Sequence, residues 1–146
     1  MLKNIPSILS PDLLKVLMEM GHGDEILLAD GNFPSASIAK RLIRLDGNSI
    51  PEILNAILLF FPLDTYVEKS VSLMQVVSTD KFVPEVWKDY KTIIKNSGEK
   101  FTDFEYIERF EFYKRAQNVY AVIATSETAL YGNIILKKGV VNSQKE

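Results

Sequence analysis

The sequence contains no cysteine. Disulfide bonds, thiolate nucleophiles and thiolate-bound metal sites are therefore excluded. Histidine is nearly absent as well, because His22 is the only one in the chain. A metal site would consequently need almost entirely carboxylate ligands, so this composition does not favour a metal site. We expect neither a metal ion nor another cofactor.

Long apolar runs and an excess of charge are also missing. The longest strongly apolar stretch, residues 53–63, is interrupted by Asn55 and Pro62 and is too short to cross a bilayer. The amino terminus lacks the basic segment and long apolar region of a signal peptide. The formal net charge of -2 offers no electrostatic reason to bind nucleic acid or an anionic membrane. These absences favour a cytoplasmic protein without nucleic-acid or membrane partners.

The motifs of two large enzyme classes are missing too. Gly21, Gly23 and Gly31 do not have the spacing of a dinucleotide-binding fingerprint, and no glycine-rich phosphate loop is present. Neither Ser37 nor Ser126 has the sequence context of a nucleophile elbow. Nothing in the chain therefore indicates a nucleotide-dependent enzyme or a serine hydrolase.

What the chain does contain is the composition of an ordinary globular domain: 146 residues, 47% of them hydrophobic and 25% charged. Apolar periodicity and capping signals predict helices over residues 11–20, 49–61, 84–96 and 108–116. Apolar runs predict strands over residues 25–29, 40–45, 70–78, 119–125 and 133–140. Their alternation indicates a layered α/β fold in a single domain over residues 1–146, with the polar residues 142–146 fraying.

The stretch from residue 20 to residue 34 carries the first candidates for chemistry. The first helix is predicted to end at Gly21, because glycine adopts the left-handed conformation without steric cost. Residues 25–29 form an apolar run without alternation, which predicts a parallel strand buried on both faces. His22 precedes this strand, and Asp30 stands at its carboxyl end, where open α/β sheets usually carry ligands. The two residues are candidates for proton transfer.

Each of these two residues also has a structural interpretation. A histidine at the end of a helix interacts favourably with the helix dipole. An aspartate in the position of Asp30 can cap the turn through Gly31 and Asn32. As a functional residue, His22 would be a general acid or base with a pKa near the working pH. Both interpretations stay open on these residues alone.

Two further segments offer polar groups to a ligand. Arg109 opens the last predicted helix, as a surface residue or as the partner of Glu105 or Glu108. Helical spacing predicts that the core-facing stripe of this helix is Phe110, Tyr113 and Ala116. The segment Tyr131-Gly132-Asn133 precedes the final strand, either as the turn of a hairpin with residues 119–125 or as a site for a polyhydroxylated ligand. A phenol, a backbone that permits close approach and an amide suit such a ligand.

Taken together, these segments resemble the family that contains L-fucose mutarotase and D-ribose pyranase. In the amino-terminal part the resemblance lies in residues 1–3, 9–11, 13–16, 19–25 and 33–34. In the carboxyl-terminal part it lies in residues 109–110, 112–113, 115–117, 131–133 and 136–140. The form Gly21-His-Gly-Asp-Glu25, and Tyr131-Gly-Asn133 before the last strand, favour the fucose branch over the ribose branch. The resemblance covers essentially the whole chain, although residues 69–100 carry no motif.

The resemblance implies a three-layer α/β/α sandwich like that of ribose pyranase, and a ring-shaped homo-oligomer (a decamer or an octamer) with sites at subunit boundaries. It implies interconversion of the α and β anomers of a free monosaccharide, L-fucose or D-ribose. His22 matches the family's proton donor. The positions that match its sugar contacts are Asp30, Arg109, Tyr131, Gly132 and Asn133. The alternatives are a D-ribose pyranase and a sugar-binding or regulatory protein without turnover.

Overall fold

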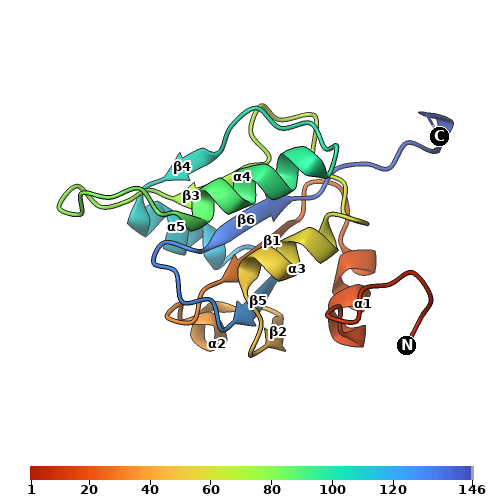
Figure 1. Ribbon diagram of the computed structural model, residues 1–146, viewed down its shortest axis with the longest axis horizontal. Helices are drawn as coiled ribbons and strands as arrows, with labels where there is room; N and C mark the ends of the chain where they lie inside the picture. The colour runs from red at the N-terminus through yellow and green to blue at the C-terminus, as the bar shows by residue number, and fades with distance from the viewer. Residues whose placement is uncertain (146) are drawn as a thin grey trace.

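A six-stranded mixed sheet forms the centre of the computed structural model, which describes residues 1–145 (Figure 1). Its strands are β1 (Glu25–Ala29), β2 (Leu42–Leu45), β3 (Val71–Met74), β4 (Glu105–Ile107), β5 (Ala121–Thr125) and β6 (Ile134–Lys137). They lie in the order β2-β5-β1-β6-β3-β4. The predicted strand at residues 25–29 is therefore central, and all but its first residue are buried.

Strand direction decides which loops of the molecule meet. β5 is parallel to β1 and to β2, and β3 is parallel to β4. β6 runs antiparallel to both of its neighbours, β1 and β3. The carboxyl ends of five strands and the amino end of β6 therefore share one edge of the sheet, which we call the carboxyl edge. The opposite edge, where β1 begins and β6 ends, is the amino edge.

Helices cover both faces of this sheet. They are α1 (Pro11–Glu19), α2 (Ser35–Ile38), α3 (Ile50–Ile57), α4 (Val86–Asn96) and α5 (Arg109–Ala116). Alternate residues of β1 enter two separate cores, because successive strand side chains point to opposite faces. Ile26 and Leu28 join the core beneath α1, α3 and α4, whereas Leu27 and Ala29 join the one beneath α5. Figure 1 shows α3 and α4 across one face and α5 on the other, so the predicted three-layer α/β/α class is confirmed.

The starts of the helices follow local capping chemistry, as predicted. The Ser10 hydroxyl accepts a hydrogen bond from the Leu13 amide, and a proline occupies the first turn of α1. Ser49 and Glu52 form the predicted capping box of α3. The Glu108 carboxylate caps α5 by accepting two backbone amides. These signals act within one turn, which is why the sequence locates them well.

Several predicted boundaries are wrong, mostly at the ends of elements. α3 ends at Ile57 rather than near residue 61, and the strand predicted over residues 70–78 ends at Met74. The short elements α2 and β4 lie in segments predicted to be irregular. Gly21 does not take the left-handed conformation, which Gly23 adopts instead with a φ of 87°. The end of α1 is capped by the Lys138 ammonium, which donates to the carbonyls of Leu17 and Met20.

Two tertiary expectations are also corrected. β6 pairs with β1 and β3, so residues 131–133 are not the turn of a hairpin with β5. In α5 the buried residues are Phe112 and Ala116, whereas Phe110 is 72% exposed. Aromatic residues at positions 110, 112 and 113 satisfy helical spacing on more than one face. Packing against the sheet selects the face that is buried, and helical spacing alone carries no information about that packing.

After β6 the chain leaves the sheet at the amino edge. Within residues 142–146, which were predicted to fray, Ser143–Lys145 form a short 3-10 turn, and residue 146 lies outside the described residues. Among residues 1–145 no helix has both the length and the apolar character required to cross a bilayer.

Candidate functional site

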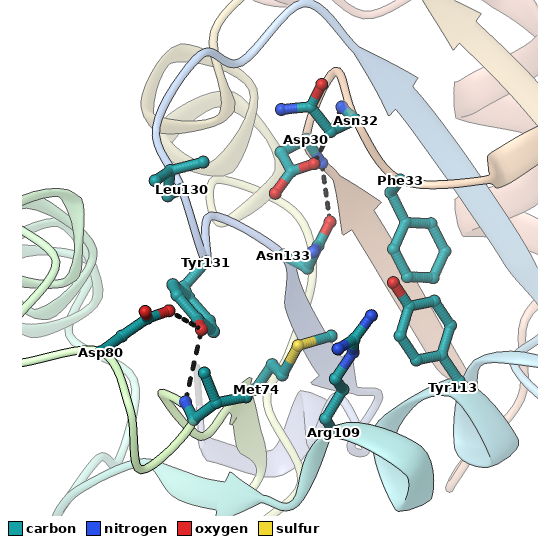
Figure 2. Close-up of a pocket in the computed structure, with 11 residues that line it drawn as sticks. Asp30, Asn32, Phe33, Met74, Asp80, Arg109, Tyr113, Leu130, Tyr131 and Asn133 are labelled. Atoms are coloured by element: carbon teal, nitrogen blue, oxygen red, sulfur yellow. Dashed lines mark hydrogen bonds between the residues drawn. The ribbon is translucent and has the colours of Figure 1, made fainter.

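A cavity of about 320 Å³ opens at the carboxyl edge of the sheet. Figure 2 shows the side chains that surround it. They are Asp30, Asn32, Phe33, Met74, Val77, Asp80, Arg109, Tyr113, Leu130, Tyr131 and Asn133. Four of the predicted site residues are in this set, and Gly132 lies between two of them. The volume is that of a small-ligand site.

The order of the strands explains why these residues meet. Asp30 follows β1, Met74 ends β3, and Arg109 begins α5 two residues after β4. The segment 131–133 precedes β6, whose antiparallel direction brings its amino end to the carboxyl edge. Side chains from four distant parts of the chain therefore surround one cavity, at the place where α/β sheets carry ligands.

Asp30 forms the floor of the cavity, where only 7% of its surface remains exposed. Its backbone amide donates to Asn133 Oδ1 over 2.8 Å, and its Oδ1 accepts the Asn32 amide over 3.0 Å. Burial raises the pKa of the Asp30 carboxyl above its ordinary value, and the neighbouring Glu127 carboxylate adds to this effect. Hydrogen bonds from nearby backbone amides oppose the shift. Asp30 is thus a partly desolvated carboxylate that a ligand hydroxyl can approach.

The turn before β6 brings the backbone close to Asp30. A Cβ atom at Gly132 would lie 3.0 Å from the Ala129 carbonyl and 3.5 Å from the Asp30 Cβ, so a side chain there would be crowded. The Gly132 carbonyl accepts a hydrogen bond of 2.6 Å from the buried Tyr90 hydroxyl. Because Asn133 uses its Oδ1 on Asp30, its amide NH2 group remains a donor for a ligand.

Arg109 lies at the rim without a carboxylate partner among the described residues. Neither of the predicted ion pairs forms, because Glu105 pairs with Arg115 and Glu108 caps α5. Arg115 also binds Glu25 through its guanidinium. The Arg109 guanidinium points toward the cavity beside Tyr113 (Figure 2), where its N–H groups can serve a ligand.

The cavity also has an aromatic wall that the sequence analysis did not assign. Phe33 and Tyr113 stack with their ring centroids 5.4 Å apart and their planes at 7°. Both residues lie in segments that resemble the sugar-isomerising family, and this is the only sequence signal that could have found them. A flat apolar wall opposite polar groups suits a sugar, whose ring has an apolar face and polar hydroxyls.

His22 lies at the other end of β1, away from this cavity. The five residues of β1 span about 17 Å at about 3.4 Å per residue, so within one chain His22 cannot reach a ligand beside Asp30. Its Nε2 is 3.0 Å from Asp64 Oδ1, and its ring lies 5.2 Å from the ring of Tyr66. The chain thus brings five of the six predicted residues together, counting Gly132, and keeps the sixth, the predicted acid His22, apart.

Asp64 is the residue that holds His22, and the sequence analysis missed it. Only 4% of the Asp64 side chain is exposed. Burial favours the neutral acid, but hydrogen bonds from the Tyr66 amide and from His22 outweigh it, and the pKa of Asp64 is lowered. Because a carboxylate only accepts hydrogen bonds, His22 Nε2 carries a hydrogen. Nδ1 is then the ring nitrogen that can interact with a ligand. The local sequence has no signal for this contact, which depends on the bridge between Leu63 and Lys138.

Among residues 1–145 no group of three or more histidine or acidic side chains is arranged to hold a metal ion. The polar groups of the cavity are instead those that bind hydroxyls.

Comparison with known proteins gives this geometry a context. The model of the RbsD / FucU transport protein family matches residues 3–141. The chain belongs to this family. The resemblance stated from the sequence is therefore confirmed over nearly the whole chain.

Similar proteins carry a consistent name. The chain is 51% identical to the human protein named fucose mutarotase, over 96% of this chain and 94% of that protein. It is 48% identical to the L-fucose mutarotase of Actinobacillus pleuropneumoniae, over 96% of this chain and 97% of that one. In both comparisons the match covers nearly the full length of the relative.

Solved structures agree with the fold. The fucose mutarotase of Streptococcus pneumoniae, crystallised with L-fucose, superposes with a TM-score of 0.92 at 55% identity, over 97% of this chain and 100% of that one. Bacillus subtilis RbsD complexed with D-ribose superposes with a TM-score of 0.73 at 24% identity, over 97% of this chain and all of that one. The second likeness shows a shared fold.

Proposed function

We propose that this protein is a mutarotase that interconverts the α and β anomers of free L-fucose. One observation carries the proposal: the residues expected to contact a sugar surround a single cavity, in a chain 55% identical to a fucose mutarotase crystallised with L-fucose. The enzyme class is that of the carbohydrate isomerases, which the names of the relatives support.

The reaction needs two proton transfers and no other chemistry. The ring oxygen takes up a proton while the anomeric hydroxyl loses one, the bond between the ring oxygen and the anomeric carbon breaks, and an open-chain aldehyde forms. Rotation about the next carbon–carbon bond exposes the other face of the aldehyde. Reversal of the two proton transfers closes the ring as the other anomer. Groups that hold hydroxyls and one well-placed acid are therefore sufficient.

The cavity residues act as the binding half of this site. Asp30 accepts hydrogen bonds from sugar hydroxyls, because its carboxylate is desolvated and incompletely paired. Arg109 and the Asn133 amide donate to them. The ring of Tyr131 and the stacked pair Phe33 and Tyr113 enclose the sugar from the sides. The backbone at Gly132 allows the sugar to approach Asp30 closely.

His22 is the acid in this proposal, and its Nδ1 delivers the proton to the ring oxygen. Asp64 fixes the orientation of the imidazole through the hydrogen bond to Nε2, a contact that becomes an ion pair when the ring is protonated. An acid placed in this way is worth about a hundredfold or more in rate. The proton acceptor for the anomeric hydroxyl is left unassigned.

In this proposal a second copy of the chain supplies His22 to the cavity. The separation along β1 excludes a site within one chain, and both edges carry exposed apolar side chains that a contact between copies would cover. Tyr66, whose ring lies beside His22, is 80% exposed, and Leu130, which lines the cavity, is 59% exposed. Met18 of α1 is 85% exposed, and Phe110, which follows the cavity residue Arg109, is 72% exposed. Because the two surfaces differ, the contact is head-to-tail, and repeated head-to-tail contacts form a ring when the rotation between copies closes. This supports the ring-shaped homo-oligomer that the resemblance implies.

The decisive experiment is NMR saturation transfer between the anomeric protons of L-fucose, with and without the protein, repeated with D-ribose. We expect faster exchange for fucose and its loss in His22→Ala. Acceleration of ribose alone would move the protein to the pyranase alternative. Fucose binding without acceleration would identify a sugar-binding protein instead. A folded His22→Ala variant that binds fucose and exchanges it at the wild-type rate would exclude His22 as the acid.

A further inference from the structure

Tyr131 has an unusual backbone that its surroundings hold in place. Its φ of 57° is in the left-handed region, which residues other than glycine rarely adopt. The Trp87 Nε1–H donates to the Tyr131 carbonyl over 2.9 Å, and the Tyr90 hydroxyl donates to the next carbonyl, that of Gly132. Both side chains come from α4. The position of Tyr131 is therefore determined from outside its own turn.

The side chain of Tyr131 is held from a different direction. Its hydroxyl donates to Asp80 Oδ2 over 2.7 Å and accepts the Val77 amide over 3.3 Å (Figure 2). A phenol has one hydrogen, and here that hydrogen is committed to a carboxylate. Consistent with this, the hydrogen bond to Asp80 raises the pKa of Tyr131, with a smaller contribution from burial. In this arrangement Tyr131 presents its ring, rather than a free hydrogen, to the cavity.

Asp80 belongs to the loop of residues 75–85, which joins β3 to α4 and projects from the sheet in Figure 1. Residues 78–83 of this loop are all exposed. Within residues 1–145, the hydrogen bonds from residues 76–83 to the rest of the chain run to the Tyr131 hydroxyl alone. The Phe82 ring also packs on the Tyr131 ring, at 5.7 Å between centroids. A loop with so few attachments depends strongly on each of them.

We propose that Asp80 is a positioning residue of the sugar site, which fixes the Tyr131 phenol and thereby fastens the loop of residues 75–85 along the side of the cavity. The inference rests on the proposed function in that the cavity is taken as a sugar site. Asp80 acts through Tyr131, so breaking the bond lets the Tyr131 ring rotate and the loop leave the cavity wall. Asp30 and Asn133 keep their own hydrogen bond to each other. We therefore expect weaker sugar binding and little change in the rate at which bound sugar exchanges its anomers.

The test compares Asp80→Ala, Tyr131→Phe and the double variant, with Thr79→Ala as a matched control on a neighbouring exposed residue. The first readout is independent of activity: the rate of tryptic cleavage after Lys81, which is exposed in the loop. We expect both single variants to be cleaved about tenfold faster than wild type, as the loss of a charge-assisted hydrogen bond implies. The double variant should be no faster than the singles, and Thr79→Ala should match wild type.

The second readout is the split between KM and kcat for L-fucose exchange. Both single variants should raise KM about five- to tenfold with kcat within about twofold of wild type, because ground-state and transition-state binding are lost equally. Asp80→Asn keeps an acceptor oxygen and should fall between wild type and Asp80→Ala. This partial rescue separates loss of the hydrogen bond from disruption of the fold. Asp80→Asn also takes the place of Asp80→Ala as the test variant if Asp80→Ala does not fold.

Two results would overturn the inference. One is cleavage at Lys81 at the wild-type rate in both Asp80→Ala and Tyr131→Phe. The other is additive effects in the double variant, because residues that act through one bond cannot add. If the wild-type protein does not exchange fucose, the proposed function fails, but the cleavage rates still decide whether Asp80 fastens the loop. The two failures are therefore distinguishable.

Discussion

The two edges of the sheet carry the two groups of residues on which the proposed function depends. At the carboxyl edge, Asp30, Arg109 and Asn133 surround a cavity that can hold hydroxyls, but no histidine reaches it. At the amino edge, His22 is held by the buried Asp64 and faces outward. The proposed reaction needs both groups, and the length of β1 keeps them apart within one chain. On the proposed function, the active unit is therefore a contact between copies rather than the single chain.

The largest expected effect comes from substituting the key residue of each edge in separate proteins. His22→Ala and Asp30→Asn should each lower fucose exchange about a hundredfold or more, since one removes the acid and the other the central acceptor. Mixing the two inactive proteins, after dissociation and reassembly, should restore about a quarter of wild-type activity, because a head-to-tail contact pairs an intact His22 with an intact Asp30 in one site out of about four. NMR exchange rates of the mixture measure this.

The control for the mixture is the double variant carrying both substitutions in one chain. Mixed with either single variant, it contributes neither intact residue, so activity should stay at the level of the inactive proteins. If instead the mixture of the two single variants recovers nothing while wild type is active, the shared site is excluded.

The next effect concerns the support of His22 at the amino edge. Asp64→Asn should lower exchange about tenfold to a hundredfold, the usual cost of removing a carboxylate that orients a functional histidine. The substitution should also lower the free energy of unfolding near neutral pH by about 1–3 kcal/mol, since Asp64 is buried and hydrogen-bonded. The pKa of Asp64 is lowered in the fold, so this stabilisation exists above the unfolded-state pKa and is lost as pH falls through the folded-state pKa.

Urea unfolding of wild type and Asp64→Asn at about pH 7 and about pH 3 checks that sign. The difference between the two proteins should be large at the higher pH and small at the lower one. An equal difference at both values would mean that charge on Asp64 does not stabilise the fold.

A third effect concerns the surfaces that join the edges. Phe110→Asp should weaken association and lower exchange several-fold without lowering the stability of the isolated chain, because Phe110 is exposed and contributes nothing to the core. Sedimentation velocity over a concentration series measures the assembly. Lys95→Asp, a charge change at an exposed position of α4, is the control for charge alone. Unchanged assembly in Phe110→Asp would show that the surface around Phe110 is not part of the contact between copies.

The smallest effect separates function from stability at the carboxyl edge. Burial raises the pKa of Asp30, so the ionised form is disfavoured in the fold, and stability from this residue declines as pH rises through its folded-state pKa. Asp30→Asn should therefore be as stable as wild type near pH 7, or more stable by up to about 1 kcal/mol, although it is inactive. Thermal unfolding at neutral pH measures this. A clear loss of stability would show that Asp30 is structural.

The sequence located the elements whose signals are local. Ser10 and Ser49 begin helices through hydrogen bonds within one turn, and residues 25–29 are apolar enough to predict the central strand without knowledge of its neighbours. Asp30 was found for a related reason, because its position at the end of that strand is itself a local fact. The family resemblance added the roles that spacing could not supply.

The tertiary structure decided the contacts between distant residues, because these contacts depend on the order of the strands in the sheet. The antiparallel entry of β6 between β1 and β3 brings residues 131–133 to Asp30, about a hundred residues away in the chain, and carries Lys138 to the end of α1. The contact between His22 and Asp64 and the buried face of α5 have the same origin. Capping and periodicity act over a few residues, whereas these contacts are selected by packing across the sheet, and no local pattern encodes that choice.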